Sequence, residues 1–120
     1  MNDINIAVSQ FLLKTTTIIE TLGIWQHEDD NIDLLISLTK PLDLITSFLK
    51  RTNENWELAN LSLPHAYLPV LINLELLKKN VRTICRKVEI FIYPRDFKIS
   101  LIEFDTQYVL YKQKIRNENF

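Results

Sequence analysis

Acidic side chains are concentrated in one short segment of this 120-residue chain, where four carboxylates lie within six residues at Glu28, Asp29, Asp30 and Asp33. Four carboxylates can bind a divalent cation, but the EF-hand loop needs ligands at alternating positions and a turn glycine, and this segment has neither. We therefore predict no metal site. The acidic segment instead suits a basic surface on a partner protein, because charge complementarity speeds association. The alternative is a solvated link between helices, in which Asp30 caps the helix that follows.

Basic side chains are densest further along the chain. Lys78, Arg82 and Arg86 follow one another at steps of four, with Lys79 and Lys87 beside them. Residues four apart share one face of a helix, and a stripe of cations can follow the phosphates of a nucleic acid. The alternative is a solvated helix face near a C-terminus, where cations are favoured. The net charge of −1 supports the solvated face, since nucleic-acid-binding domains are usually strongly basic.

The two charge clusters belong to a wider asymmetry. Residues 1–63 carry nine acids and four bases, a net charge of −5, whereas residues 64–120 carry ten bases and six acids, a net charge of +4. The small total charge therefore hides a charge dipole, which predicts two surfaces of opposite sign.

Cysteine, histidine and glycine are too scarce for most cofactor chemistry. Cys85 is the single cysteine, so an internal disulfide is excluded, and with only His27 and His65 a Cys/His zinc site is also out of reach. The single glycine, Gly23, excludes the glycine-rich phosphate loops of dinucleotide-binding and P-loop proteins. Neither histidine has an evident serine nucleophile at a sharp turn. We predict no catalytic residues and no cofactor.

A weak nuclease pattern is the one remaining enzyme signal. Asp96 and Lys98 form a D-x-K triplet at the start of a predicted strand, as in metal-dependent nucleases, and Glu89 is the only acid available on a neighbouring strand. A three-residue pattern of this kind occurs often by chance, so a small nuclease is the weakest of the functional alternatives.

The apolar segments predict neither export nor a membrane span. Asp3 stands where a secretory signal carries positive charge, and the longest uncharged stretch, residues 58–74, is interrupted by prolines and polar residues. We predict one globular domain over residues 1–120, located in the cytoplasm, where a lone cysteine stays reduced.

Helical periodicity dominates the first three quarters of the chain. A first helix is predicted from Ile4 towards Trp25; the β-branched threonines of residues 15–17 weaken its centre, so the alternative is a break or a strand from Thr15 to Ile19. A second helix is predicted from Asp30 to Arg51, with a bend or restart near Lys40 because of Pro41. Residues 52–60 are predicted to form a loop. The clearest helix spans about 68–87, and its apolar seam consists of Tyr67, Val70, Leu74, Leu77, Val81, Ile84 and Val88.

The last third of the chain changes to the alternation typical of strands. Residues 88–93, 97–104 and 108–115 predict three strands separated by turns, although the last of them also fits helical spacing. The predicted fold is therefore α+β: N-terminal helices and one long central helix packed on an antiparallel three-stranded sheet. Phe91 and Tyr93 would lie on the face of the sheet away from the helices, as exposed aromatic residues suited to an interface.

These observations favour a non-catalytic intracellular interaction protein, such as an inhibitor, an immunity or antitoxin-like neutraliser, or a small subunit of a complex. Its partner would be a protein, bound through the acidic segment or the exposed aromatic residues. The first alternative is a nucleic-acid-binding module that uses the basic helix.

Overall fold

The computed structural model describes residues 2–21, 28–55, 64–87 and 94–119, of which 2–3, 28–31, 64–68 and 118–119 are described by their backbone only. Its elements are α1 (Asn2–Thr21), α2 (Glu28–Asn55), α3 (Pro64–Lys87) and α4 (Arg95–Asn119). The described part of the chain contains no strand. The predicted α+β fold with a C-terminal three-stranded sheet is therefore wrong, and the described residues form an all-helical bundle.

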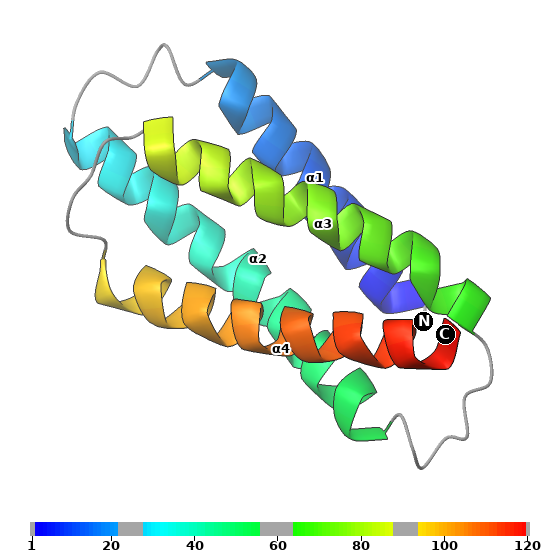
Figure 1. Cartoon of the computed structure of the whole chain (residues 1–120). Helices are drawn as coiled ribbons and strands as arrows, with labels where there is room; N and C mark the ends of the chain where they lie inside the picture. Colours follow the sequence, from blue (N-terminus) through cyan, green and yellow to red (C-terminus); the bar gives the residue numbers. More distant parts are fainter. Residues whose placement is uncertain (1, 22–27, 56–63, 88–93, 120) are drawn as a thin grey trace.

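The four helices form two parallel pairs (Figure 1). α1 and α3 lie side by side and run in one direction, whereas α2 and α4 run in the opposite direction. Packing is most extensive within these pairs, and the α1–α2 and α3–α4 interfaces between them are looser. The bundle measures 49 × 25 × 23 Å, and no described helix contains a stretch long and apolar enough to span a bilayer.

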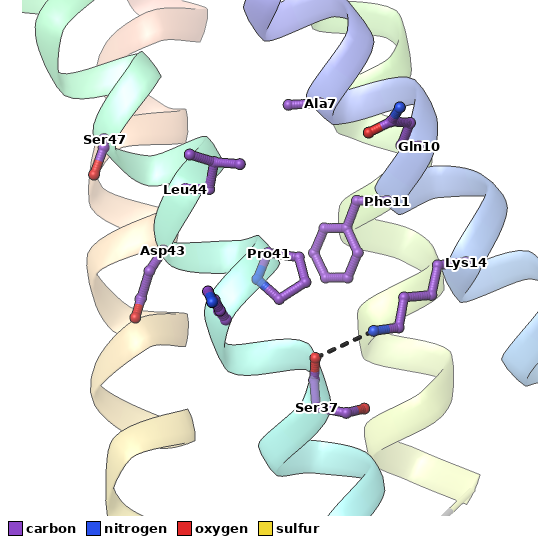
Figure 2. A pocket seen from close by; sticks show the side chains of 10 residues that line it. Ala7, Gln10, Phe11, Lys14, Ser37, Pro41, Asp43, Leu44 and Ser47 are labelled. Atoms are coloured by element: carbon purple, nitrogen blue, oxygen red, sulfur yellow. Dashed lines mark hydrogen bonds between the residues drawn. The ribbon is translucent and has the colours of Figure 1, made fainter.

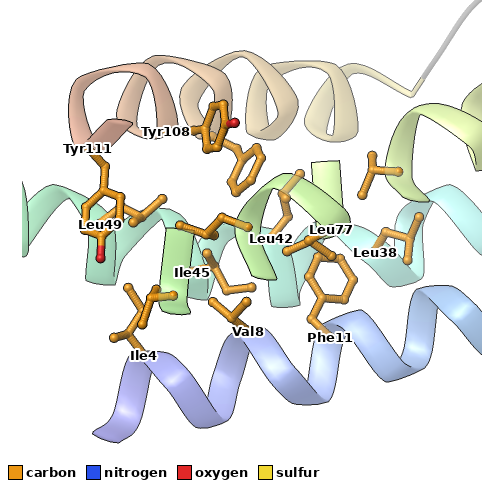
Figure 3. Close-up of a cluster of buried hydrophobic side chains, with 14 of the residues drawn as sticks. Ile4, Val8, Phe11, Leu38, Leu42, Ile45, Leu49, Leu77, Tyr108 and Tyr111 are labelled. Atoms are coloured by element: carbon orange, nitrogen blue, oxygen red, sulfur yellow. The ribbon is translucent and has the colours of Figure 1, made fainter. Parts of the chain in front are cut away.

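One continuous core runs along the bundle (Figure 3). Each helix contributes residues at steps of three and four, the spacing of an apolar face in antiparallel bundles. The buried hydrophobic side chains are Ile4, Val8, Phe11 and Ile18 in α1; Leu34, Leu35, Leu38, Leu42, Ile45 and Leu49 in α2; Val70, Leu71, Leu74, Leu77, Val81 and Ile84 in α3; and Phe97, Phe104, Tyr108, Tyr111 and Ile115 in α4. The predicted seam of α3 is confirmed from Val70 to Ile84.

The two last predicted strands, 97–104 and 108–115, are successive parts of α4. The helix starts where turn chemistry was predicted, because the carbonyl of Pro94 accepts a hydrogen bond from the Lys98 amide, 3.0 Å away. Aromatic residues usually favour strands, but here their spacing places Phe97, Phe104 and Tyr111 on one helical face that closes the core. Tertiary packing thus overrides local propensity. The first predicted strand, 88–93, lies outside the described residues.

The threonine run of α1 remains helical because its hydroxyls are bound to the helix itself. Thr15 and Thr16 both donate to the carbonyl of Leu12, at 2.8 and 2.9 Å, and Thr17 donates to that of Leu13, at 3.0 Å. Asn80 of α3 in turn donates from Nδ2 to the hydroxyls of Thr15 and Thr16, at 3.1 and 3.2 Å. The break considered for this segment does not occur, and the run supplies a polar contact between α1 and α3.

A second polar contact joins the other pair. Asn53, predicted to lie in a loop, belongs to the last turn of α2, is buried, and donates from Nδ2 to the Gln107 carbonyl and to its Oε1, at 3.0 and 2.9 Å. Since hydrogen bonds of this kind are satisfied at one relative position of the helices only, they set the register within each pair.

Pro41 lies inside α2, which continues past it without the restart considered from the sequence. Proline has no amide hydrogen, so the carbonyl four residues earlier, that of Ser37, loses its helical donor. Lys14 of α1 supplies the replacement: its Nζ lies 3.3 Å from the Ser37 oxygen (Figure 2). α2 therefore remains one continuous helix past Pro41, and a neighbouring helix supplies the donor for the vacated carbonyl.

The role of Lys14 as the donor that replaces the missing amide of Pro41 can be tested by mutation. Lys14→Met should lower the free energy of unfolding by about 0.5–1.5 kcal/mol, the usual contribution of one hydrogen bond. In the Pro41→Ala background the same change should cost less, because the amide restored at position 41 can donate to the Ser37 carbonyl. Urea unfolding of the four proteins measures the coupling, and Lys98→Met, which removes another exposed lysine, is the control. An equal cost of Lys14→Met in both backgrounds would contradict the role given to Lys14.

Candidate functional site

Four of the five predicted basic residues of α3, all except Lys87, line pockets along the looser α3–α4 interface. The structure gives the five residues two different environments. Lys78 is partly buried between the helices, whereas the other four, Lys79, Arg82, Arg86 and Lys87, are exposed to solvent. The stripe predicted from the sequence is therefore partly a structural contact and partly a free surface.

Lys78 is held by α4. Its Nζ lies 3.4 Å from Asp105 Oδ1 and 4.7 Å from the centroid of the Tyr108 ring. That carboxylate oxygen is buried and makes no hydrogen bond of good geometry, so its interaction with Lys78 is an ion pair at contact distance. An ammonium group over an aromatic face is also attracted by the ring electrons. Lys78 therefore joins α3 to α4 and has less freedom to bind a partner.

A second bridge lies further along the same interface. Lys112 Nζ of α4 is 3.3 Å from Glu75 Oε1 of α3 and 5.8 Å from the centroid of the Tyr108 ring. Tyr108, itself buried, thus contacts the ammonium groups of both bridges. These partly exposed pairs contribute little to stability individually, but they cross the looser interface and leave both carboxylates paired.

Two pockets along this interface share the lining residues Lys78, Arg82 and Arg86, and together we call them the α3–α4 groove. One, of about 450 Å³, has apolar walls from Val81, Cys85, Leu101 and Phe104 and polar walls from Lys78, Arg82, Arg86 and Asp105. The other, of about 410 Å³, is lined by Glu75, Lys78, Lys79, Arg82, Arg86, Tyr108 and Lys112. Five cations thus face two carboxylates, and both carboxylates are already paired.

The α4 side of the groove was missed from the sequence because α4 was predicted to be two strands. Leu101, Phe104, Tyr108 and Lys112 follow at steps of three and four, which is the signal that could have found them. Cys85, which lies between Arg82 and Arg86 in the sequence, packs against the core and also lines the groove.

The acidic set lies at the start of α2. Because α2 begins at Glu28, Asp30 lies inside the helix and is not its cap, contrary to the solvated-link interpretation. Carboxylates in a first turn are favoured by the helix dipole. Asp33 is exposed, while the side chains of Glu28, Asp29 and Asp30 are not among those described. The predicted aromatic site, Phe91 and Tyr93, lies outside the described residues.

Among the residues that the structure describes, the D-x-K nuclease pattern does not lie beside a strand, as a metal-dependent nuclease site requires. Asp96 and Lys98 lie in the first turn of α4 and not at the start of a strand, and Glu89 lies outside the described residues. Within the described ranges, no group of three or more histidine, cysteine, aspartate or glutamate residues is placed to hold a metal ion.

No protein-family model, curated protein or solved structure matches this chain. Its function is therefore inferred from the groove itself.

Proposed function

We propose that this chain is a non-catalytic interaction protein of the cytoplasm, which binds an acidic, partly apolar segment of a partner protein in the α3–α4 groove. One observation carries the proposal: exposed cations and an apolar wall occur together in this groove, while the carboxylates there are paired to lysines. A partner with carboxylates beside a hydrophobic anchor complements both features.

The small net charge of the chain and the apolar wall of the groove favour a protein partner over a nucleic acid. A backbone-tracking surface carries many cations and a strongly basic overall charge, whereas this chain has a net charge of −1. Arg82 and Arg86 instead flank a pocket walled by Val81, Leu101 and Phe104. An apolar wall flanked by arginines suits an amphipathic helix laid into a groove. Binding to nucleic acid is the alternative outcome of the test.

The test compares two labelled probes of equal net charge by fluorescence anisotropy: a helical peptide with a leucine face flanked by glutamates, and a single-stranded oligonucleotide. We expect the peptide to bind more tightly and its affinity to fall as salt is added. Arg82→Glu combined with Arg86→Glu should weaken peptide binding about tenfold or more, because the introduced carboxylates repel the glutamates of the peptide.

The control is Arg95→Glu combined with Arg116→Glu, which makes the same charge change at two exposed arginines outside the groove. It should alter peptide binding much less than the groove variant does. Tighter binding of the oligonucleotide would replace the proposal with the nucleic-acid alternative. Absence of binding to either probe, or an equal loss in both double variants, would overturn it.

A further inference from the structure

Another pocket lies on the opposite side of the bundle, in the looser α1–α2 interface (Figure 2). Its volume is about 690 Å³, within the range of about 300–1,000 Å³ that small-molecule sites occupy. It is lined by Ala7, Gln10, Phe11 and Lys14 of α1 and by Ser37, Lys40, Pro41, Asp43, Leu44 and Ser47 of α2. None of these residues belongs to the α3–α4 groove.

The pocket is polarised along its length. The rings of Phe11 and Pro41 lie next to each other in the middle of the view, and Ala7 and Leu44 lie towards one end (Figure 2). Leu44 is 51% exposed, although a large aliphatic side chain is normally favoured away from water. At the other end the ammonium group of Lys14 lies near the Ser37 carbonyl. The apolar surface of the pocket therefore ends at a positive charge.

The cation is held in place by the helix irregularity at Pro41. The proline leaves the Ser37 carbonyl without its helical donor, and that carbonyl accepts one hydrogen bond from Lys14 Nζ. An ammonium group has three donors, so two remain for a ligand. Pro41 therefore has two roles: its ring forms part of the apolar wall, and its missing amide positions the charge at the end of that wall.

From this arrangement we infer that the α1–α2 pocket binds a small amphipathic carboxylate, with its alkyl chain against Pro41 and Leu44 and its carboxylate on Lys14. Charge complementarity selects an anion over a cation or a neutral ligand of the same size. Lys40 adds a second positive charge to the rim. Asp43, the one acid among the lining residues, points away from Phe11 and Lys14 in Figure 2.

Isothermal titration calorimetry with decanoate and decanol tests the inference, because the two probes share an alkyl chain and differ in charge. Decanoate should bind about tenfold or more tightly than decanol, as expected for one charge-assisted hydrogen bond. Lys14→Met should abolish this preference and leave decanol binding unchanged. Pro41→Ala should reduce the preference, since Lys14 then loses the acceptor that positions it.

Matched variants separate the pocket from general surface binding. Leu44→Gln should weaken both probes, whereas Ile102→Gln, at a similarly exposed residue of α4, should leave both unchanged. Lys40→Met should retain the preference for decanoate. Equal affinity for the two probes, loss of the preference in Lys40→Met but not in Lys14→Met, or the absence of any binding would overturn the inference. Circular dichroism melting curves establish that each variant is folded.

Discussion

Replacing Phe104 with alanine should lower the free energy of unfolding by about 3–5 kcal/mol, whereas Ile102→Ala should change it by no more than about 0.5 kcal/mol. Phe104 is 1% exposed and belongs to the core. Removal of its ring loses the transfer free energy of the buried atoms and leaves a cavity that the helices fill only in part. Ile102 is 57% exposed, and alanine is the better helix former.

This pair distinguishes the observed helix from the strand predicted for the same residues. In a strand, positions 102 and 104 lie on the same face, so truncating either side chain should have a similar cost. In a helix they are about 200° apart, so the costs differ. Urea unfolding followed by far-UV circular dichroism gives both free energies. Comparable losses for the two variants would contradict the helical structure of α4.

The second large effect is expected at the centre of α3. Leu77→Ala should destabilise the protein by about 2–5 kcal/mol, because Leu77 is fully buried in the core. Leu76, its neighbour in the chain, is 47% exposed and supplies a control of the same residue type on the same helix. Leu76→Ala should stay within about 0.5 kcal/mol of the wild type.

The same urea experiment measures this second pair. The slope of the unfolding free energy against urea should remain unchanged, since neither substitution alters the surface exposed on unfolding appreciably. If Leu76→Ala proved as costly as Leu77→Ala, the buried face of α3 would be misassigned, and with it the orientation of the basic residues towards α4.

The first three helices were predictable because their apolar residues follow a single period. In α3, Val70, Leu74, Leu77, Val81 and Ile84 define one face without ambiguity, and the structure buries all five. The basic stripe follows from the same seam, since Arg82 and Arg86 can only lie away from it. Local spacing was sufficient in this region because one pattern decides both the helix and its buried face.

The α4 helix was not predictable in the same way. Ile99, Ile102, Val109 and Leu110 are exposed, so they add apolar residues to the sequence that do not mark the core. They blur the helical period of Phe97, Phe104 and Tyr111 into an apparent alternation, and the aromatic and β-branched residues of this segment favour strands locally. Burial against the other helices decides the conformation, and that gain is not visible in any window of neighbouring residues.

The amino-acid sequence by itself thus determined the existence of α1, α2 and α3 (although not the last turn of α2), the core face of α3 and the cations that could bind an anion. Only the tertiary structure decided which contacts the side chains of these residues make. It turned Lys78 into a bridge to Asp105 and Tyr108, and it let Lys14 satisfy the carbonyl that Pro41 leaves free. The physical reason is distance along the chain: these contacts join residues 23 or more positions apart, and their energies depend on which helices meet.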